Sequence, residues 1–512
     1  MADAKLPGLV ITGASGFIGR NFVEANRENF VIYAIARRSQ QEVNIPRHKN
    51  IKWFLADITD REHVRDIFQE VIAGGGADYF VHLAAFFDFS NEPNSEYERT
   101  NIQGSKIIFE EAARLDLKRF IFASSLVVSE FPKPGERLDE SSQLDADFPY
   151  AVTKIAGEDM AREWSKTYPC SVVRFAAVFS DWCEYGPLYK FLDTWSSNSW
   201  KSRVLGGKGN SAVPYIHITS LLRMMNLILD RSEELKDFDI YIASPDNSSS
   251  HQELFDTSTR FFFGEKRRAI HMPVLLSRLG VWGMDFLGRL IGKRPFERPW
   301  MMKYIDERME VDASYTRETL NWEIIPRYSL ERRILHVIEH MKTFPADWHQ
   351  RNDLALHKSP DRPNLRISDT LSDLEHRILD ELLEKIQATE NSQRFPAYQR
   401  MEADKLSWYL GILFNLLKVS VRTGDRLSVS NYARFIASIR IHEGFKLEEV
   451  VDVYQSLSEI VIQNLLQHGT IRDLEQRIRD DIDLTIQMAI DEIEDAYEIA
   501  LAPASYTRFH LR

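Results

Sequence analysis

The feature that most constrains the fold of this chain is a glycine-rich turn, Thr-Gly-Ala-Ser-Gly-Phe-Ile-Gly, at residues 12–19. It follows an apolar run at residues 9–11 and opens an amphipathic helical pattern. Gly13 permits a sharp turn, Gly16 lets the backbone approach a pyrophosphate, and Gly19 lets the helix pack close to a sheet. The free N–H groups and positive end of that helix favour bound phosphate. The turn therefore predicts a strand-turn-helix unit that binds a dinucleotide.

Apolar, β-branched runs alternate with helical patterns from residue 8 to residue 130. Strands separated by helices form right-handed βαβ units, so the sheet is parallel and covered on both faces. We expect an α/β fold, a doubly wound Rossmann parallel sheet, with strands at residues 9–11, 30–35, 51–55, 79–83, 120–123 and 171–175.

A chain of 512 residues is too long for one ordinary domain. Residues 1–178 are predicted to form the dinucleotide-binding core, and residues 179–344 a smaller substrate-binding lobe interleaved with it. A linker is expected over residues 345–369, where prolines lie among polar residues and apolar periodicity is lost. Residues 370–505 have helical apolar periodicity, which predicts a separate all-α bundle.

Charge and cysteine content exclude several classes of function. The formal net charge is −12, whereas general nucleic-acid binding needs a basic face that displaces counterions. Only Cys170 and Cys183 occur, too few for a disulfide framework, so we expect a reducing, cytoplasmic location. The first ten residues do not have the pattern of a signal peptide. No Cys/His cluster has the spacing of a metal site.

Tyr150 and Lys154 stand four residues apart in a predicted helix, which places them on one face. A free phenol has a pKa of about 10. A neighbouring ammonium lowers that pKa, so we expect Tyr150 to act as a general acid or base. Ser124 and Ser125 end the preceding strand, where side chains of α/β sheets face the ligand crevice. A hydroxyl there can orient a carbonyl oxygen for hydride attack by a nicotinamide, while Lys154 holds the ribose.

The segment after the second predicted strand distinguishes the two nicotinamide dinucleotides. NAD sites usually place a carboxylate there for the ribose hydroxyls, but this chain has Arg37 and Arg38 and no acid. Two guanidinium groups can bind a 2′-phosphate through charge-assisted hydrogen bonds, which favours NADP(H). A solvated basic loop is the alternative, and NAD(H) is then the cofactor. Asp57, just after the third strand, is expected to reach the adenine ring.

Four further motifs resemble those of the extended short-chain dehydrogenase/reductases, the epimerase/dehydratase-like superfamily: His-Leu-Ala-Ala at 82–85, Thr-Asn-Ile-Gln-Gly at 100–104, Ala-Ser-Ser at 123–125 and Tyr-Ala-Val-Thr-Lys at 150–154. The resemblance covers about residues 8–340 and implies that Ser125, Tyr150 and Lys154 are catalytic. Asn101 is expected to support the site, and His82 to be structural rather than an acid or base. The implied cofactor contacts are Gly13, Ser15, Gly16, Phe17, Ile18, Gly19, Arg37, Arg38, Asp57, Ile58, Leu83, Ala84, Ala85, Asn101, Tyr150 and Lys154.

Departures from the family pattern narrow the reaction. Sugar-nucleotide dehydratases tend to follow the catalytic hydroxyl with an acidic pair, whereas Leu126 and Val127 follow Ser125 here. Sugar-nucleotide epimerases usually carry an Arg-Asp pair before a Tyr-Ile-His run, and this chain has Val-Pro before residues 215–217. A diphosphate-binding arginine is therefore missing, which favours a hydrophobic small molecule and a ketoreductase or alcohol dehydrogenase. Aromatic residues suited to such a substrate are Phe86, Phe87, Phe89 and Trp182.

Two other functions remain as alternatives. A sugar-nucleotide epimerase would retain NAD tightly. A redox-sensing regulator would bind NADP(H) without turnover and signal through the helical domain, although a sensor has no need of the proton donor Tyr150.

Residues 430–466 resemble the helical, globin-like sensor domain at the amino terminus of stressosome co-antagonist (RsbR-type) regulators. The resemblance implies dimerisation or signal sensing, so a homodimer and a signalling partner are expected. His442 invites a haem hypothesis, but a polar histidine at a helix end is the favoured interpretation.

Residues 272–292 are apolar but contain Arg278, Asp285 and Arg289, which a membrane-spanning helix rarely tolerates. The favoured interpretation is a helix that lines the substrate pocket. The alternative is an interfacial helix that dips into a bilayer or admits a lipid-like substrate.

Overall fold

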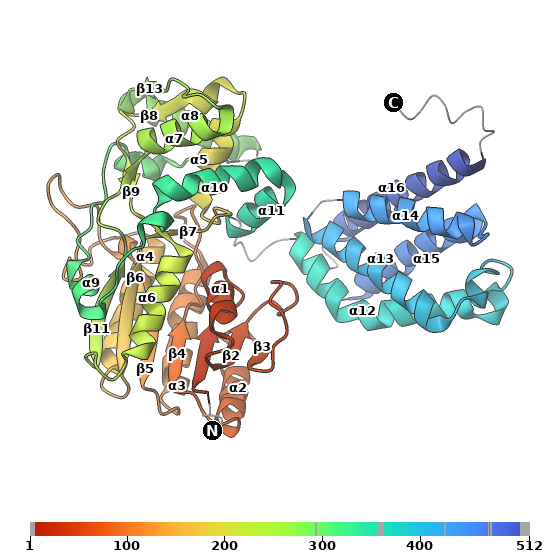
Figure 1. The fold of residues 1–512 in the computed structure, drawn as a ribbon, viewed down its shortest axis with the longest axis horizontal. Coiled ribbons are helices and arrows are strands. Elements are labelled where there is room, and N and C mark those ends of the chain that lie inside the picture. Colours follow the sequence, from red (N-terminus) through yellow and green to blue (C-terminus); the bar gives the residue numbers. More distant parts are fainter. Residues whose placement is uncertain are drawn as a thin grey trace. The chain divides into compact units, whose positions relative to one another are not determined.

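The computed structural model describes residues 6–291, 294–356, 363–423, 426–468, 471 and 474–501. The chain divides into two compact units, Met1–Lys358 and Ser359–Arg512 (Figure 1).

A seven-stranded parallel sheet forms the centre of the N-terminal unit, with strand order β11-β6-β5-β4-β1-β2-β3. This order reverses between β1 and β4, where doubly wound sheets bind ligands at the carboxyl ends of their strands. The predicted Rossmann α/β class is confirmed. The strands are β1 Gly8–Thr12, β2 Val31–Ala36, β3 Ile51–Leu55, β4 Tyr79–His82, β5 Arg119–Ser125, β6 Cys170–Phe175 and β11 Phe238–Ala243.

Helices cover both faces of this sheet (Figure 1). On one face, α1 (Phe17–Asn26) and α6 (Ile218–Asp230) pack in a core cluster with β1 and β6. On the other, α2 (Arg61–Ala73), α3 (Ser105–Ala112) and α4 (Pro149–Trp164) form a second cluster. Burial on both faces explains why the strands are apolar along their whole length.

The rest of the unit forms a lobe above the carboxyl edge of the sheet. Its core joins α5, α7, α10 and α11 around buried aromatic and aliphatic side chains. Its helices are α5 Gly186–Ser196, α7 His251–Phe263, α8 Val274–Ile291, α10 Leu330–Thr343 and α11 Pro345–Leu356, whereas α9 Ser314–Leu320 packs against β11 and α6 beside the sheet. Its short strands pair as β7 Ala177–Phe179 with β10 Tyr215–His217, β8 Val204–Gly206 with β13 Ile270–Met272, and β9 Ala212–Val213 with β12 Ser249–Ser250.

The linker predicted over residues 345–369 is wrong for most of its length. Helix α11 spans Pro345–Leu356 and α12 begins at Pro363, while residues 357–362 lie outside the described residues. Proline is tolerated in the first turn of a helix, where its missing N–H has no partner to lose. Pro345 and Pro363 therefore start two helices within the predicted linker.

The C-terminal unit is helical, and its apolar side chains form one buried cluster. His442 is the exposed last residue of α14, with Nδ1 2.7 Å from the Ser438 carbonyl oxygen. In the described part of the chain, no helix is long and apolar enough to cross a membrane. The long helices are α12 Pro363–Gln387, α13 Ala403–Thr423, α14 Leu427–His442, α15 Leu447–Gln467 and α16 Glu475–Leu501.

Helix α4 lies close to β5 because Gly157 has no side chain: a Cβ there would lie 2.1 Å from Cζ of Phe122, a buried residue. We predict that Gly157→Ala lowers the free energy of unfolding by about 1–3 kcal/mol, because the Phe122 ring has to move in a filled core. Thermal unfolding of the full chain measures this.

The matched control is Gly283→Ala on α8, where an added Cβ meets no described atom within 4 Å. Alanine favours a helix over glycine by about 0.5–1 kcal/mol, so this variant is expected to be as stable as the wild type or slightly more so. Equal destabilisation by both substitutions would contradict the close packing of α4.

Candidate active site

The glycine-rich turn has the geometry that a dinucleotide site requires. Gly13 has φ +70°, and a Cβ there would lie 2.7 Å from the backbone nitrogen of Ala84. At Gly19 a Cβ would lie 2.3 Å from the Gly13 carbonyl oxygen. Both positions exclude any larger residue, so the turn keeps the backbone at the sheet edge open and close to β4.

The amino end of α1 is suited to phosphate. Gly16 caps the helix without a side-chain hydrogen bond, and the first turn contains no acidic residue. Its N–H groups and positive dipole are therefore available to an anion. Phe17 and Ile18 line a cavity that extends into the lobe, and Ser15 is a buried residue of the turn. These residues fit the pyrophosphate of a dinucleotide.

The end of β2 carries no carboxylate. Arg37 is exposed, and the guanidinium of Arg38 donates to the Ser15 carbonyl oxygen, which holds it beside the glycine turn. Asp57 accepts from Thr59, through its N–H at 3.0 Å and its hydroxyl at 2.9 Å, and from Arg99 at 3.0 Å. Burial raises the pKa of Asp57, but these hydrogen bonds and the Arg99 charge have the larger, opposite effect. The pKa is therefore below its ordinary value, and the carboxylate is ionised.

The segment after β4 lies directly against the glycine turn. The Leu83 N–H donates to the Thr12 carbonyl oxygen at 3.2 Å, and the Ala84 N–H lies 3.4 Å from the Thr12 hydroxyl. Asn101 secures the next residues: its side chain exchanges hydrogen bonds with the Phe86 backbone at 2.6 and 2.9 Å. Asn101 also donates to the Thr153 hydroxyl at 2.9 Å and so connects this segment to α4.

Two other predicted cofactor contacts are Ala85 and Ile58. Ala85 lies in the segment after β4. Ile58 is buried and packs closely on Gly104, where an added Cβ would lie 2.8 Å from the Ile58 Cδ1.

His82 is the buried last residue of β4 and lies opposite Thr12 of β1. Its Nδ1 lies 2.6 Å from the Thr12 hydroxyl and its Nε2 lies 3.0 Å from the Ser105 hydroxyl. Burial, with a smaller contribution from the Lys154 charge, lowers its pKa to about 3. A neutral ring with both nitrogens engaged agrees with a structural role.

Ser125, Tyr150 and Lys154 meet at the carboxyl edge of β5. Tyr150 is the second residue of α4, and its ring packs on Phe87 with a centroid distance of 4.5 Å. The Lys154 ammonium lies 5.7 Å from the Tyr150 ring centroid and donates to the Ala123 carbonyl oxygen at 2.7 Å. The Ser125 hydroxyl lies 3.5 Å from the Phe175 carbonyl oxygen, a long contact. Both Ser125 and Tyr150 line the same cavity as Phe17 and Ile18.

One electrostatic prediction at this site is wrong for the protein without cofactor. Burial, and then the neighbouring Tyr97, raise the pKa of Tyr150 above its ordinary value, whereas Lys154 was expected to lower it. The phenol is thus protonated at neutral pH, and the ammonium is engaged by a carbonyl oxygen. Tyr150 in this form is a proton donor.

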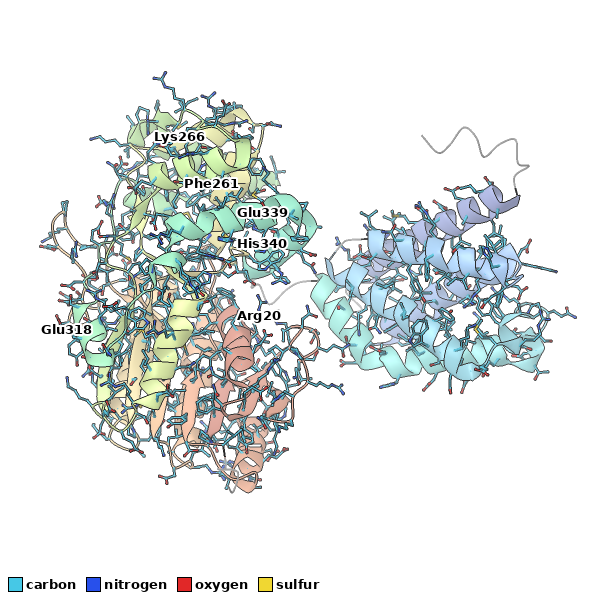
Figure 2. The ribbon with its side chains drawn as sticks, viewed as in Figure 1. Arg20, Phe261, Lys266, Glu318, Glu339 and His340 are labelled. Carbon is cyan, nitrogen blue, oxygen red and sulfur yellow. The ribbon has the colours of Figure 1, made fainter. Side chains whose placement is uncertain are left out.

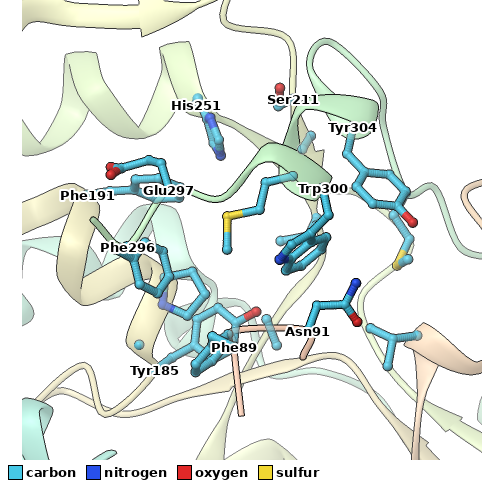
Figure 3. A pocket seen from close by; sticks show the side chains of 18 of the residues that line it. Phe89, Asn91, Tyr185, Phe191, Ser211, His251, Phe296, Glu297, Trp300 and Tyr304 are labelled. Atoms are coloured by element: carbon cyan, nitrogen blue, oxygen red, sulfur yellow. The ribbon is translucent and has the colours of Figure 1, made fainter. Parts of the chain in front are cut away.

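A cavity of about 960 Å³ extends from these residues into the lobe (Figure 3). Figure 3 shows Phe89, Tyr185, Phe296 and Trp300 facing one another around its interior. Residues 295–305 contribute much of one wall. Sequence reasoning missed this wall, because the segment has no regular pattern that would place it over the sheet.

Two aromatic residues expected in the pocket lie elsewhere. Phe86 is buried against Tyr97 at 4.9 Å between ring centroids, and Trp182 stacks on His340 at 4.2 Å. Phe87 and Phe89 do line the cavity.

The charged groups that line the cavity are mainly acidic. Among its described lining residues the basic side chains are Lys201 and His251, and burial lowers the pKa of His251 to about 4, which leaves it neutral at pH 7. The acidic lining residues are Asp88, Glu130, Glu184, Glu297 and Glu307.

Two of these carboxylates have cationic partners. Glu130 pairs with Lys303 at 2.9 Å, and Glu184 pairs with Arg20 of α1, which is labelled in Figure 2. Burial, and the charges of Arg351 and Arg38, lower the pKa of Arg20 to about 10, so it is charged at neutral pH. These pairs neutralise two acids but leave the cavity without an excess of positive charge.

Known proteins share this fold and these motifs. Residues 9–243 match the model of the NAD dependent epimerase/dehydratase family. This part of the chain belongs to that family. This match confirms the extended short-chain dehydrogenase/reductase resemblance for residues 9–243, whose family consists of NAD-dependent enzymes.

The curated relatives include enzymes of several specificities. A dTDP-glucose 4,6-dehydratase of Streptomyces niveus is 27% identical over 241 residues, covering 43% of this chain and 68% of the relative. An Escherichia coli O157:H7 protein, N-acetyl-alpha-D-glucosaminyl-diphospho-ditrans,octacis-undecaprenol 4-epimerase, is 23% identical over 290 residues, or 56% of this chain and 81% of the relative. A uronate dehydrogenase of Pseudomonas syringae pv. tomato is 28% identical over 196 residues, 36% of this chain and 68% of the relative.

Solved structures agree on the fold of the N-terminal unit. The UDP-glucose 4-epimerase of Thermotoga maritima superposes with a TM-score of 0.50 and 20% identity, covering 65% of this chain and 98% of that one. A dTDP-glucose 4,6-dehydratase of Bacillus anthracis in complex with NAD gives a TM-score of 0.50 at 18% identity, over 67% of this chain and 99% of that one. At these identities the likeness establishes the fold alone.

The buried His82 generates a pH prediction. Its folded pKa of about 3 lies below the unfolded value of about 6.5, so its contribution to stability is present above pH 6.5 and is lost as the pH falls. Relative to His82→Gln, which is neutral throughout, the wild type should lose about 2 kcal/mol between about pH 7.5 and about pH 5.

Urea unfolding of both proteins at each pH measures this difference, and His251 contributes equally to both. A stability difference that does not change with pH would show that His82 is free to protonate in the folded protein.

Proposed function

We propose that this protein is an NAD(P)-dependent oxidoreductase that interconverts a carbonyl and an alcohol on an uncharged, hydrophobic small molecule. The observation that carries this proposal is the cavity above Ser125 and Tyr150: it is lined by aromatic and aliphatic side chains and has Lys201 as its only charged basic group among the described lining residues. A nucleotide diphosphate would enter a site with more carboxylates than cations, at a Coulombic cost. An apolar substrate would gain from the same lining.

The site residues divide the chemistry between them. Tyr150 is protonated and faces the cavity, so it can donate a proton to the oxygen of a bound carbonyl, or accept one in the reverse direction. The Ser125 hydroxyl makes only long contacts within the protein and is available to orient that oxygen. A bound nicotinamide would supply or accept the hydride. Lys154, now on the Ala123 carbonyl, is placed to exchange that partner for a ribose hydroxyl.

We further propose NADP(H) as the preferred cofactor. The support is the absence of an acid at the end of β2 and the presence of Arg37 and Arg38 there, with Arg38 already held against the glycine turn. The related dehydratase of Bacillus anthracis was solved in complex with NAD. A direct comparison of the two cofactors therefore decides this point.

Cofactor preference is measured by titrating the purified chain separately with NADPH and NADH and following nicotinamide fluorescence. Removing one charge-assisted contact in Arg37→Ala should raise the Kd for NADPH about tenfold to a hundredfold and the Kd for NADH less than about threefold. Arg47→Ala, an exposed arginine in the same loop, is the control. Tighter binding of NADH, or equal losses for both cofactors, would contradict the NADP(H) proposal.

The role of Tyr150 is tested with NADPH and the hydrophobic ketone that gives the fastest turnover in a panel. Tyr150→Phe removes the proton donor and should lower kcat by about a hundredfold or more with little change in NADPH affinity. Tyr185→Phe, a second cavity tyrosine, should change kcat by less than about threefold. Similar losses in both variants would indicate a packing effect rather than proton transfer.

A sugar-nucleotide epimerase is the second candidate, and it is supported by the likeness to a 4-epimerase among the relatives described above. It would require a diphosphate to bind beside Lys201, with NAD retained during purification. Saturable binding of UDP-glucose, together with co-purified NAD, would place the epimerase first.

We propose dimerisation or regulation for the helical unit. It exposes large apolar side chains, among them Trp408 at 62%, Leu427 at 66% and Phe435 at 60%. If the chain is instead a redox-sensing regulator, Tyr150→Phe would change neither partner binding nor any measurable turnover.

A further inference from the structure

Helix α8 has the reverse of the usual orientation for a surface helix. Its large apolar residues point away from the protein: Leu275, Leu279, Trp282, Phe286 and Leu290 are each between 62% and 70% exposed. The residues that face the protein are small or polar, namely Ser277, Val281, Asp285 and Gly288. Soluble proteins rarely leave a continuous apolar stripe of this kind in water.

The polar side chains on the inward face of α8 are hydrogen-bonded, and these bonds stabilise the observed orientation of the helix. Asp285 is 3% exposed and accepts from Arg289 at 3.0 Å, Arg294 at 2.8 Å and Arg298 at 3.1 Å. The Ser277 hydroxyl donates to the Met272 carbonyl oxygen at 3.1 Å. Turning α8 over would remove the Asp285 carboxylate from Arg294 and Arg298, which follow the helix, whereas Arg289 lies on α8 and would turn with it. The apolar stripe is therefore held outward.

The surroundings of the stripe are basic. Residues 265–298 contain eight Lys or Arg and three Asp or Glu, although the whole chain has a net charge of −12. Arg278 is exposed at the edge of the stripe, where its long side chain can extend to a charged surface. Lys266 lies at the same end of the lobe as α8 (Figures 1 and 2). An apolar face with a cationic border fits an anionic lipid surface.

We propose that α8 is an interfacial helix that lies in the surface of a bilayer containing anionic lipids. The helix has 18 residues and so is about 27 Å long, which is ample for an in-plane contact. Trp282, in the middle of the stripe, is a residue type that prefers the headgroup region. No described helix of the chain is suited to crossing the bilayer, so the contact is with one leaflet.

A second copy of this chain is a poorer occupant of the stripe. A two-fold pairing of α8 with itself would bring two identical basic borders together, because such an interface places the same surface on both sides. Like charges oppose that contact, whereas anionic headgroups attract both borders.

The proposed contact of α8 with a bilayer also affects how a substrate reaches the cavity. Ser277, Gly280, Val281 and Met284 line the cavity from α8, so one helix separates the proposed bilayer surface from the substrate site. A hydrophobic substrate dissolved in the bilayer would then have a short path to Tyr150. This last consequence rests on the proposed function, whereas lipid binding by α8 does not.

The experiment is vesicle flotation of the full chain, which needs neither cofactor nor turnover. Vesicles of phosphatidylcholine alone are compared with vesicles of phosphatidylcholine and phosphatidylglycerol in about equal parts. We expect the wild type to float with the mixed vesicles. The triple variant Leu279→Glu, Phe286→Glu, Leu290→Glu should bind more than about tenfold more weakly. Its exposed positions leave the core intact, which an unchanged thermal unfolding midpoint verifies.

Two further variants separate the contributions. Leu335→Glu on α10 also replaces an exposed leucine, 47% exposed, and should bind as the wild type does. Arg278→Gln should weaken binding to the mixed vesicles about threefold to fivefold and leave the weak binding to phosphatidylcholine unchanged. Failure of the wild type to float, or equal flotation of the triple variant, overturns the proposal. A wild-type dimer that the triple variant converts to a monomer would assign the stripe to self-association instead.

Discussion

The buried carboxylate of Glu158 joins α4 to two strands of the sheet, and the arrangement of the site depends on this connection. It accepts from Arg174 of β6 at 2.8 and 3.0 Å and from the Ser124 hydroxyl of β5 at 2.5 Å. A buried charge is costly unless it is paired and hydrogen-bonded, and here both conditions are met. Because α4 cannot rotate or slide without breaking these bonds, Tyr150 at its amino end is held over the carboxyl edge of β5.

The ligand site on either side of Tyr150 consists of two chemically different halves. One half is backbone: a glycine turn and a helix terminus without acids, suited to phosphates. The other half is the side-chain cavity of the lobe, which is apolar and has little positive charge. Tyr150 and Ser125 stand where the halves meet.

Local sequence patterns predicted the parts of this structure that depend on local physics. Strand positions follow from apolar runs that are buried on both faces, and the glycine turn follows from steric exclusion at Gly13 and Gly19. The helix that begins at Pro345 and the first turns of the helix that begins at Pro363 were not predicted, since proline both ends and starts helices and the pattern alone does not distinguish these roles. The pKa of Tyr150 depends on burial, which only the folded chain establishes.

The rest of the site is formed by residues that are far apart in the sequence. The cavity wall at residues 295–305 comes from an irregular segment, and the pairing of Arg20 with Glu184 joins α1 to the lobe. Neither has a short-range signature. The outward apolar stripe of α8 was visible as an apolar segment, but only the packing of Asp285 shows which way the helix faces.

The central claim is that the cavity above Tyr150 takes an uncharged, hydrophobic substrate rather than a nucleotide sugar. Calorimetric titration of the full chain with NADP⁺ present, using 2-dodecanol in one experiment and UDP-glucose in the other, tests it most directly. The account predicts saturable binding of the alcohol, with formation of NADPH, and no detectable binding of UDP-glucose. Saturable binding of UDP-glucose without binding of the alcohol would contradict it.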